Sequence, residues 1–282
     1  MGRNHKDLRP FIGVLKSLQG GNGYNEYVRP QILLSQQELI SESPYEMAFL
    51  ITCQVGELYV GAVCHEVRLA QHHLQHDDVY TATHTLRRAI AIFKAMNASY
   101  EITRGMQPQE WIPIKQNLGR GRSSSVHSFM FRALMFLLGK KSEKSLEPLA
   151  NTPEIYSELQ QMLHAPSLYD DVLSLLNRRG FAIPDTSIIS SFHFTNESIP
   201  EVEDSWVRVY SGSETYLDLR DLAEVMMDLA QEYETWQHLH LMLTRRTHGQ
   251  KLAYYKEPAS SWLEQNATIR LFPELWSART KM

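Results

Sequence analysis

The sequence predicts an all-α fold, and three observations support this prediction. Strand signals are scarce along the 282 residues, whereas apolar residues recur at helical spacing over long stretches. Acidic residues, glycines and prolines stand where the expected helices begin and end. No internal repeat and no low-complexity tract interrupts the pattern. We therefore expect a polar N-terminal arm over residues 1–23, followed by a single all-α domain over residues 24–282, a helical bundle.

The composition excludes several classes of function. The chain is 43% hydrophobic with a net charge of −4, which is too small and too mixed for a nucleic-acid footprint. We find no signal peptide and no run of about 18 apolar residues, so we expect no membrane span. Cys53 and Cys64 stand eleven positions apart in one predicted helix, too far apart for a disulfide. Reduced thiols suit a cytoplasmic protein.

Helices are expected over most of the N-terminal half. We predict them over residues 24–41, 44–76, 77–100 and 106–118. The acidic pair Asp77-Asp78 suits the N-terminus of the third helix, where it complements the helix dipole. A polar loop over residues 119–125 follows the fourth helix.

The C-terminal half reads in the same way. We predict helices over residues 126–138, 152–164 and 167–179, one or two long helices over 205–247, and a last helical stretch over 262–279. Gly139 and Gly180 are expected to end the first and third of these helices. Residues 185–202 look irregular, residues 252–261 form a loop, and Pro273 interrupts the last stretch.

Residues 49–59, FLITCQVGELY, are the most informative segment. Phe49, Cys53 and Glu57 are spaced i, i+4, i+8, so they share one stripe of a helix that we expect to be buried. The segment resembles the distal haem helix of the tryptophan 2,3-dioxygenase family, F-I-I-Q-H-Q-x-x-E-L-W. Cys53 stands where that family carries a histidine. The resemblance places Phe49 and Tyr100 on the wall of the distal pocket, although an aromatic stripe is also typical of a helix core.

Residues 236–249, WQHLHLMLTRRTHG, contain the candidate iron ligand. Haem iron takes a neutral imidazole or a thiolate as axial ligand, and large apolar groups around His240 would suit a porphyrin face. The segment resembles the family's proximal helix, because Trp236 precedes His240 by four positions and Gly249 follows it by nine. The resemblance implies that His240 ligates the iron of haem b, with Trp236 beside the cofactor. His238, in another register, is the competing candidate; otherwise it lies on a neighbouring helix face.

The resemblance extends over nearly the whole chain. The other matching stretches are, in order, Tyr24–Gln37, His65–Arg68, Arg132–Gly139, Ala165–Tyr169, Gly180–Pro184 and Phe272–Arg279. Each motif is short, but their shared order and spacing are specific. The resemblance implies a homotetramer, or a dimer, in which the N-terminal helices are exchanged between subunits. Tyr24 and Tyr27 would then complete a neighbour's substrate pocket, or else pack helices at a dimer seam.

The part of the site that should grip an amino acid departs from the family. The family's T-P-S-E-Y-x-x-x-R resembles residues 107–115, QPQEWIPIK, so Trp111 replaces the tyrosine and Lys115 the arginine. Lysine can pair with a carboxylate, but as a point charge without a bidentate fork. The family's glycine-rich loop resembles residues 253–259, AYYKEPA, where Tyr254 replaces the threonine. We expect these three residues to contact the substrate in a changed way.

Two candidate catalytic residues remain on the distal side. A thiol is a weak hydrogen-bond donor, so Cys53 could tune the bound ligand, ligate the iron or pack as a small apolar residue. Ser124 resembles a family serine near the haem, with loop capping as its alternative role. Arg120 and Arg122 could meet haem propionates or an acidic substrate group, or remain solvated.

The resemblance implies a haem-dependent oxygenase whose partners are dioxygen and a small aromatic substrate. The first hypothesis is insertion of dioxygen into the indole ring of tryptophan or a tryptophan-derived substrate. Its rivals are mono-oxygenation or hydroxylation of a modified aromatic amino acid or indole in natural-product biosynthesis, and a haem-binding sensor without turnover. The altered amino-acid contacts favour a non-standard substrate.

Overall fold

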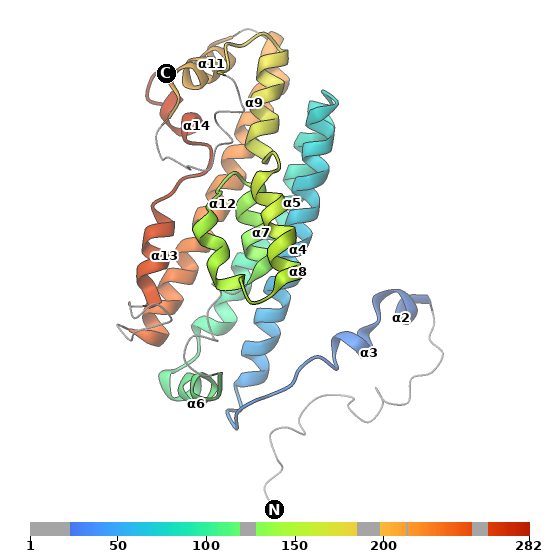
Figure 1. Ribbon diagram of the computed structural model, residues 1–282, viewed down its shortest axis with the longest axis vertical. Helices are drawn as coiled ribbons and strands as arrows, with labels where there is room; N and C mark the ends of the chain where they lie inside the picture. Colours follow the sequence, from blue (N-terminus) through green and yellow to red (C-terminus); the bar gives the residue numbers. More distant parts are fainter. Residues whose placement is uncertain (1–22, 119–127, 185–197, 213, 250–258) are drawn as a thin grey trace, which may run out of the picture.

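The computed structural model describes residues 23–118, 128–184, 198–212, 214–249 and 259–282, and every regular element in these ranges is a helix (Figure 1). The predicted all-α fold is confirmed. Three long helices form an elongated bundle, shorter helices cover it, and two small N-terminal helices project away from its body. The helical periodicity that recurs along the chain is what lets so many segments bury an apolar stripe against a neighbour.

The centre of the bundle consists of α4 (Glu46–Gln75), α5 (Val79–Arg104) and α12 (Leu217–His248). The second of these helices packs against both of the others. The side chain of Asp78 accepts a hydrogen bond from the backbone N–H of Thr81 at 3.1 Å, which caps the start of α5. The prediction that the acidic pair opens this helix is therefore confirmed.

A second layer of shorter elements follows α6 (Pro108–Leu118) in the sequence. It contains α7 (Phe129–Leu137), the 3₁₀ helix η3 (Glu143–Leu149), α8 (Pro153–His164) and α9 (Leu168–Arg178). Both α7 and α9 pack against α4. Gly139 and Gly180 adopt φ angles of 92° and 81° just after α7 and α9, a region that a side chain disfavours. The predicted glycine stops are confirmed, whereas η3 was not expected.

The C-terminal elements are α11 (Pro200–Ser211), η4 (Glu214–Tyr216), α13 (Ala259–Ala267) and α14 (Pro273–Ala278). Among them, α11 and α14 pack together at one end of the bundle, whereas α13 packs along α12 (Figure 1). The stretch over 205–247 is thus two helices, and the last stretch is interrupted at Pro273 as predicted. The buried carboxylate of Glu274 accepts hydrogen bonds from the Tyr169 hydroxyl and, at 2.9 Å, from the Ile199 backbone N–H. Two sequence motifs that lie far apart in the chain therefore meet here.

The predicted helix over residues 24–41 is wrong. Instead, α2 (Gly23–Val28) and α3 (Pro30–Leu33) are separated by Arg29, whose φ angle is 51°. Proline disfavours the helical conformation in the residue before it and has no N–H to donate, so the helix breaks at this point. The chain between Leu33 and α4 is not helical. Neither short helix has a buried residue.

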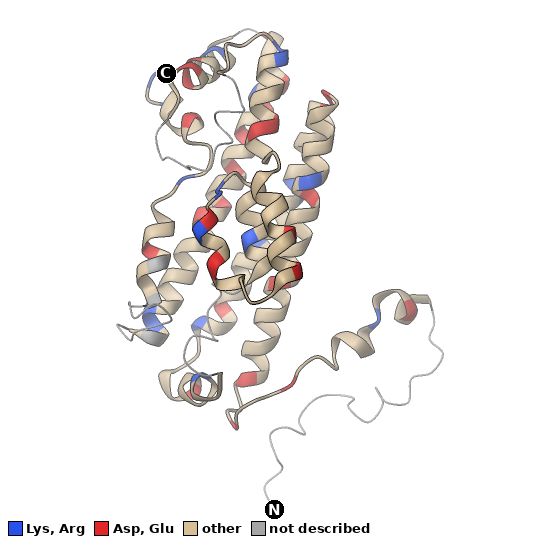
Figure 2. Cartoon of the chain, in the orientation of Figure 1, with Lys and Arg blue, Asp and Glu red and all other residues tan. Residues whose placement is uncertain are grey.

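The first half of α4 is far more exposed than the sequence suggested. It is uncharged from Met47 to Gly56 (Figure 2), yet only 17% of the most apolar 18-residue window of the helix is buried within the chain. By length and composition alone α4 would be apolar enough to cross a membrane, and one helix of this kind is weak support for a span. Its second half packs against α5, α7 and α9. The exposed first half is a surface that another molecule would be expected to cover.

Candidate functional site

The imidazole of His240, on α12, packs against two aromatic rings. Its ring centroid is 5.4 Å from that of Trp236, one turn earlier on the same helix, and 6.0 Å from that of Tyr100 on α5. The residue is half-buried, and its Nδ1 atom is buried. The accessible part of the residue therefore lies away from Nδ1.

Two further aromatic rings pack near the indole of Trp236. Phe131 on α7 lies 4.4 Å from Trp236 between ring centroids, and Tyr233 lies 6.0 Å from the same indole. Tyr233 is fully buried and Trp236 is nearly so. Because the core fixes these large rings, the indole cannot turn easily, and it holds one face of the His240 ring in place.

Tyr100 connects this cluster with α4. Burial raises the pKa of its hydroxyl well above the ordinary value, Trp236 opposes that shift, and the nearby Cys53 and Glu57 add to it. The phenol is therefore protonated over the whole physiological range and can donate a hydrogen bond. Residues from α4, α5 and α12 thus converge on the same region.

Cys53 is exposed, so it does not pack as a core residue of this chain. The surrounding protein desolvates the thiolate and the Glu57 carboxylate repels it, which together raise the pKa of Cys53 to about 11. The Oε2 atom of Glu57 accepts a hydrogen bond from the Ser128 hydroxyl at 3.0 Å. An accessible thiol with such a pKa is protonated at neutral pH and offers a weak S–H donor.

The helix α6 (Pro108–Leu118) carries the two residues predicted to grip a substrate. Trp111 is buried, and its ring packs edge-on against Phe49 of α4 at 4.7 Å between centroids. Lys115 follows one turn later and is half-buried. Met106 and Ile114 complete a small apolar cluster around Trp111, separate from the main core. The structure therefore brings Phe49, Trp111 and Lys115 to one end of the bundle.

Two other predicted residues, Tyr24 and Tyr27, are not brought to this region within the chain. Tyr24 and Tyr27 lie on α2, are 68% and 89% exposed, and belong to a helix without a buried residue. Ser124, Tyr254, Arg120 and Arg122 lie outside the described residues.

The competing histidine faces elsewhere. His238 is exposed, and its Nδ1 atom lies 2.9 Å from the Glu234 carbonyl oxygen on its own helix. Because a carbonyl only accepts, Nδ1 carries the proton in this contact. His238 therefore lies on a neighbouring helix face, which was its alternative interpretation.

The sequence analysis missed Phe131 and Ser128 as parts of this region. Ser128 also caps α7 by accepting a hydrogen bond from the Phe131 backbone N–H at 3.1 Å. A serine directly before an apolar helical run is a recognisable cap signal, and it would have placed the start of α7 next to Glu57 only with knowledge of the fold.

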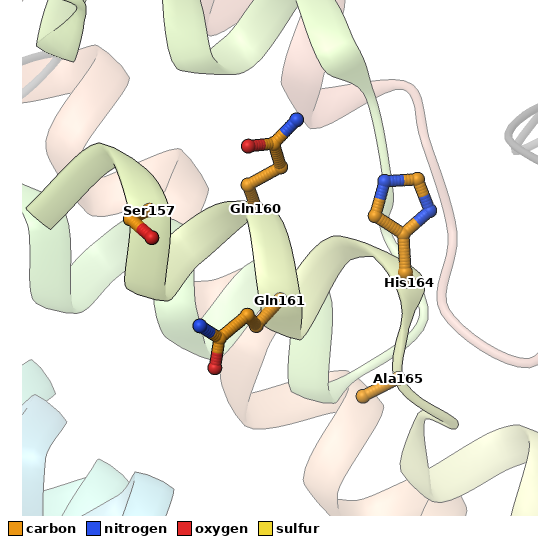
Figure 3. A pocket seen from close by; sticks show the side chains of 5 residues that line it. All are labelled: Ser157, Gln160, Gln161, His164 and Ala165. Carbon is orange, nitrogen blue, oxygen red and sulfur yellow. The ribbon is translucent and has the colours of Figure 1, made fainter. Parts of the chain in front are cut away.

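A surface hollow lies apart from the cluster around His240. It has a volume of about 530 Å³, opens beside α8, and is lined by Ser157, Gln160, Gln161, His164 and Ala165 (Figure 3). None of these five residues belongs to the aromatic cluster around His240. The hollow is open and its lining is mostly uncharged, so it does not compete with that cluster as the site of chemistry.

Comparison with known proteins decides the family. The family model described as tryptophan 2,3-dioxygenase matches residues 12–207. The chain belongs to the tryptophan 2,3-dioxygenase family. This is a family of haem-dependent oxygenases, and the chain is accordingly an enzyme of that class.

The chain is also similar along its whole length to individual tryptophan 2,3-dioxygenases. It is 33% identical to that of Bradyrhizobium sp. strain BTAi1 over 268 residues, covering 95% of both chains. It is 30% identical to that of Myxococcus xanthus over 281 residues, covering 99% of this chain and 95% of the relative. It is 34% identical to that of Caulobacter vibrioides over 259 residues, covering 92% and 98%.

The described residues fit a haem group. A porphyrin supplies four nitrogen ligands to its iron, so the protein needs to contribute only an axial side chain, and an imidazole is a common one. His240 offers a half-buried imidazole on α12, with aromatic rings packed against it. The neighbouring aromatic rings and the uncharged, exposed half of α4 are the apolar surfaces that a porphyrin face would cover.

Proposed function

We propose that this enzyme uses haem b to insert dioxygen into the indole ring of tryptophan or of a tryptophan-derived substrate. The observation that carries the proposal is the convergence of α4, α5 and α12 on one accessible imidazole, that of His240, flanked by Tyr100 and Trp236. Membership of the family supports the choice of chemistry. A bound haem would supply the redox chemistry with dioxygen.

In this proposal His240 would ligate the iron, and two aromatic residues would line the cofactor site. Trp236 restrains the imidazole, and Tyr100 lines the cofactor as a permanently protonated phenol. Ser124 is proposed to contact the cofactor or the reacting ligand from its loop, as the family resemblance implies. These residues position and desolvate the reacting groups rather than exchange protons with them.

Cys53 and Glu57 are proposed to face the reacting ligand. A thiol that stays protonated at neutral pH is a poor iron ligand, because the thiolate is the form that coordinates metals. We therefore favour the role in which Cys53 tunes the pocket as a small, weak donor over its role as an iron ligand. The altered donor is one reason to keep mono-oxygenation of a modified aromatic compound as the second candidate reaction.

The substrate is proposed to lie against α6 and its partner residue on α4. Phe49 and Trp111 supply aromatic surface for a ring, and Lys115 supplies a positive charge for a carboxylate. Tyr254 is proposed to take part from its loop. Because a lysine does not reproduce the planar fork of an arginine, we favour a tryptophan derivative over free tryptophan as the preferred substrate.

We further propose that a second copy of the chain covers the N-terminal helices α2 and α3, which we call the arm from here on. The exposed apolar residues of the arm include Tyr24, Tyr27, Ile32 and Leu33, which are between 45% and 89% exposed. Exchange of these helices in a homotetramer, or a dimer, would bury them and bring the two tyrosines to a neighbour's substrate pocket. A cytoplasmic location is proposed because both cysteines are free.

The test combines a spectrum with a product analysis. Protein loaded with haem should show a Soret band, consume dioxygen with L-tryptophan or an indole derivative, and form a ring-opened N-formyl product. Mass measurement of that product in ¹⁸O₂ should show two labelled atoms. A single labelled atom would favour mono-oxygenation. Haem binding without turnover of any aromatic substrate in a broad screen would leave the sensor as the better description.

A further inference from the structure

The segment that joins the two N-terminal helices to α4 carries four buried polar side chains, although it has no regular structure before Glu46, the first residue of α4. We call residues 37–46 the arm root. The described residues before it, 23–36, are exposed or half-buried, whereas Gln37, Ser41, Ser43 and Glu46 in the root are all less than 9% exposed. Burial of so many polar side chains is costly unless they are hydrogen bonded, so their partners indicate what the root holds.

Glu46 organises the turn in the arm root. Its carboxylate accepts hydrogen bonds from the backbone N–H of Ile40 at 2.7 Å, from that of Ser41 at 2.8 Å, and from the Ser41 hydroxyl at 2.6 Å. The Ser41 hydroxyl oxygen in turn accepts from the backbone N–H of Ser43 at 3.2 Å. A charged acceptor with three donors fixes a turn firmly, so the position of Ser43 follows from that of Glu46.

Ser43 joins this turn to α6. Its hydroxyl donates a hydrogen bond at 2.9 Å to the backbone carbonyl of Glu110, the residue immediately before Trp111. The side chain of Glu110 accepts from the backbone N–H of Gln107 at 2.7 Å, and it also raises the pKa of Tyr45 in the root. The first turn of α6 is therefore held from within and from the arm root.

The root is also joined to α4 beside Cys53. The side-chain amide of Gln37 donates to that of Gln54 at 2.8 Å, and the amide of Gln54 donates to the Gln36 backbone carbonyl at 2.9 Å. One short segment thus contacts both helices between which Phe49 and Trp111 meet.

We propose that Ser43 is a positioning residue for the substrate pocket. Through the Glu110 carbonyl it fixes the start of α6, and so sets Trp111 and Lys115 relative to Phe49, while Glu46 holds Ser43 in place. The inference rests on the proposed function in one respect, because it takes Trp111 and Lys115 as the residues that meet the substrate. Ser43 itself need not touch the substrate.

Hydrogen exchange of the full-length protein tests the positioning role without any ligand. In Ser43→Ala, backbone amides of α6 should exchange about 3- to 10-fold faster, the range expected for one lost hydrogen bond, while those of α5 and α12 stay unchanged. Ser43→Thr keeps the hydroxyl and should restore protection, and Glu46→Gln should reproduce the loss. The matched control is Ser35→Ala, which removes a hydroxyl bonded to the Ile32 carbonyl on the exposed arm.

Optical titration of the haem-loaded protein with L-tryptophan provides the second readout. Ser43→Ala should bind about 3- to 10-fold more weakly at unchanged haem content, and Ser43→Thr should recover the affinity. Unchanged exchange in α6, or an equal rise across all helices, would overturn the proposal. If the unmodified protein ignores tryptophan, the proposed substrate fails, while the exchange comparison still decides the role of Ser43.

Discussion

The ring centroids of Tyr100 and His240 lie 6.0 Å apart, which sets the phenol of α5 beside the imidazole of α12. The ring centroid of Trp236 lies 5.4 Å from that of the same imidazole. Large rings packed against an imidazole limit the rotamers open to it, so its orientation is restricted before any ligand arrives. That pre-orientation is what distinguishes His240 from the exposed His238 on the same helix.

The first prediction concerns the iron ligand. His240→Ala should abolish the Soret band of haem-loaded protein, because the substitution removes the imidazole proposed to hold the iron. His238→Ala is the matched control, since it removes an exposed imidazole two positions earlier in the same helix and should leave the band intact. Absorption spectra of the purified variants, normalised to protein, decide the matter. A full-height band in His240→Ala would exclude this assignment.

The second prediction concerns the thiol of Cys53. Its pKa of about 11 leaves little thiolate at pH 8, although the residue is exposed. Alkylation by iodoacetamide should therefore be roughly tenfold or more slower than for a free cysteine, and should accelerate as the pH rises toward 11. Cys64, which is buried with a pKa of about 12, should remain unmodified. Mass spectrometry of peptides gives both rates.

Glu57→Gln sharpens this experiment. The Glu57 carboxylate contributes to the raised pKa of Cys53, so its neutralisation should lower that pKa and speed alkylation. Bound haem should protect Cys53 if the thiol faces the cofactor as proposed. Equal rates with and without haem would place Cys53 outside the pocket, whereas a rate equal to that of free cysteine would contradict the raised pKa.

Periodicity and register predicted the helices that matter most here. The resemblance of the segment around Trp236, His240 and Gly249 to the family's proximal helix selected one histidine among twelve, and the structure packs two aromatic rings against it. Periodicity did not predict what covers a helix face. The apolar stripe through Phe49 and Cys53 indicated burial, but the chain itself leaves most of it exposed, because an apolar stripe predicts that a face is covered and not that the same chain covers it.

The arm root illustrates a second limit. The contacts of Glu46 and Ser43 run through a turn without regular structure and reach Glu110, 67 positions away from Ser43. Hydrogen bonds of this kind leave no periodic signal, so local patterns could not predict them. The break at Arg29, by contrast, is predictable from the sequence, since Pro30 follows it and disfavours the helical conformation in the residue before it.

The third prediction concerns the charge on α6. If Lys115 pairs with a substrate carboxylate, Lys115→Ala should weaken substrate binding by about tenfold while haem content stays constant, because one charge-assisted contact is lost. Lys115→Arg should preserve or tighten binding, since a guanidinium offers a bidentate fork. Optical titration with L-tryptophan and with its methyl ester separates the cases. A substrate without a free carboxylate should bind equally well to all three proteins.

The fourth prediction concerns a buried lysine. Lys140 donates a hydrogen bond to the Asn266 carbonyl at 2.9 Å and lies 5.7 Å from the centre of the Tyr233 ring. Burial, and to a smaller degree the nearby Arg132, lowers the pKa of Lys140 from 10.5 to about 7. Between pH 7 and pH 10.5 the unfolded chain binds this proton more tightly than the folded chain, so protonation of Lys140 favours unfolding. Its contribution to the free energy of unfolding therefore rises with pH across that window.

Chemical denaturation at pH 7 and pH 9 measures this effect. The free energy of unfolding should rise by about 2 kcal/mol more in the unmodified protein than in Lys140→Met, which has no titrating group at this position. Lys144→Met, a change at an exposed lysine nearby in the sequence, should keep the pH dependence of the unmodified protein. Taking the difference between proteins removes the titration of groups that they share. Identical pH dependence in all three would mean that Lys140 is solvated in the folded state, and that its contact with Asn266 does not bury its charge.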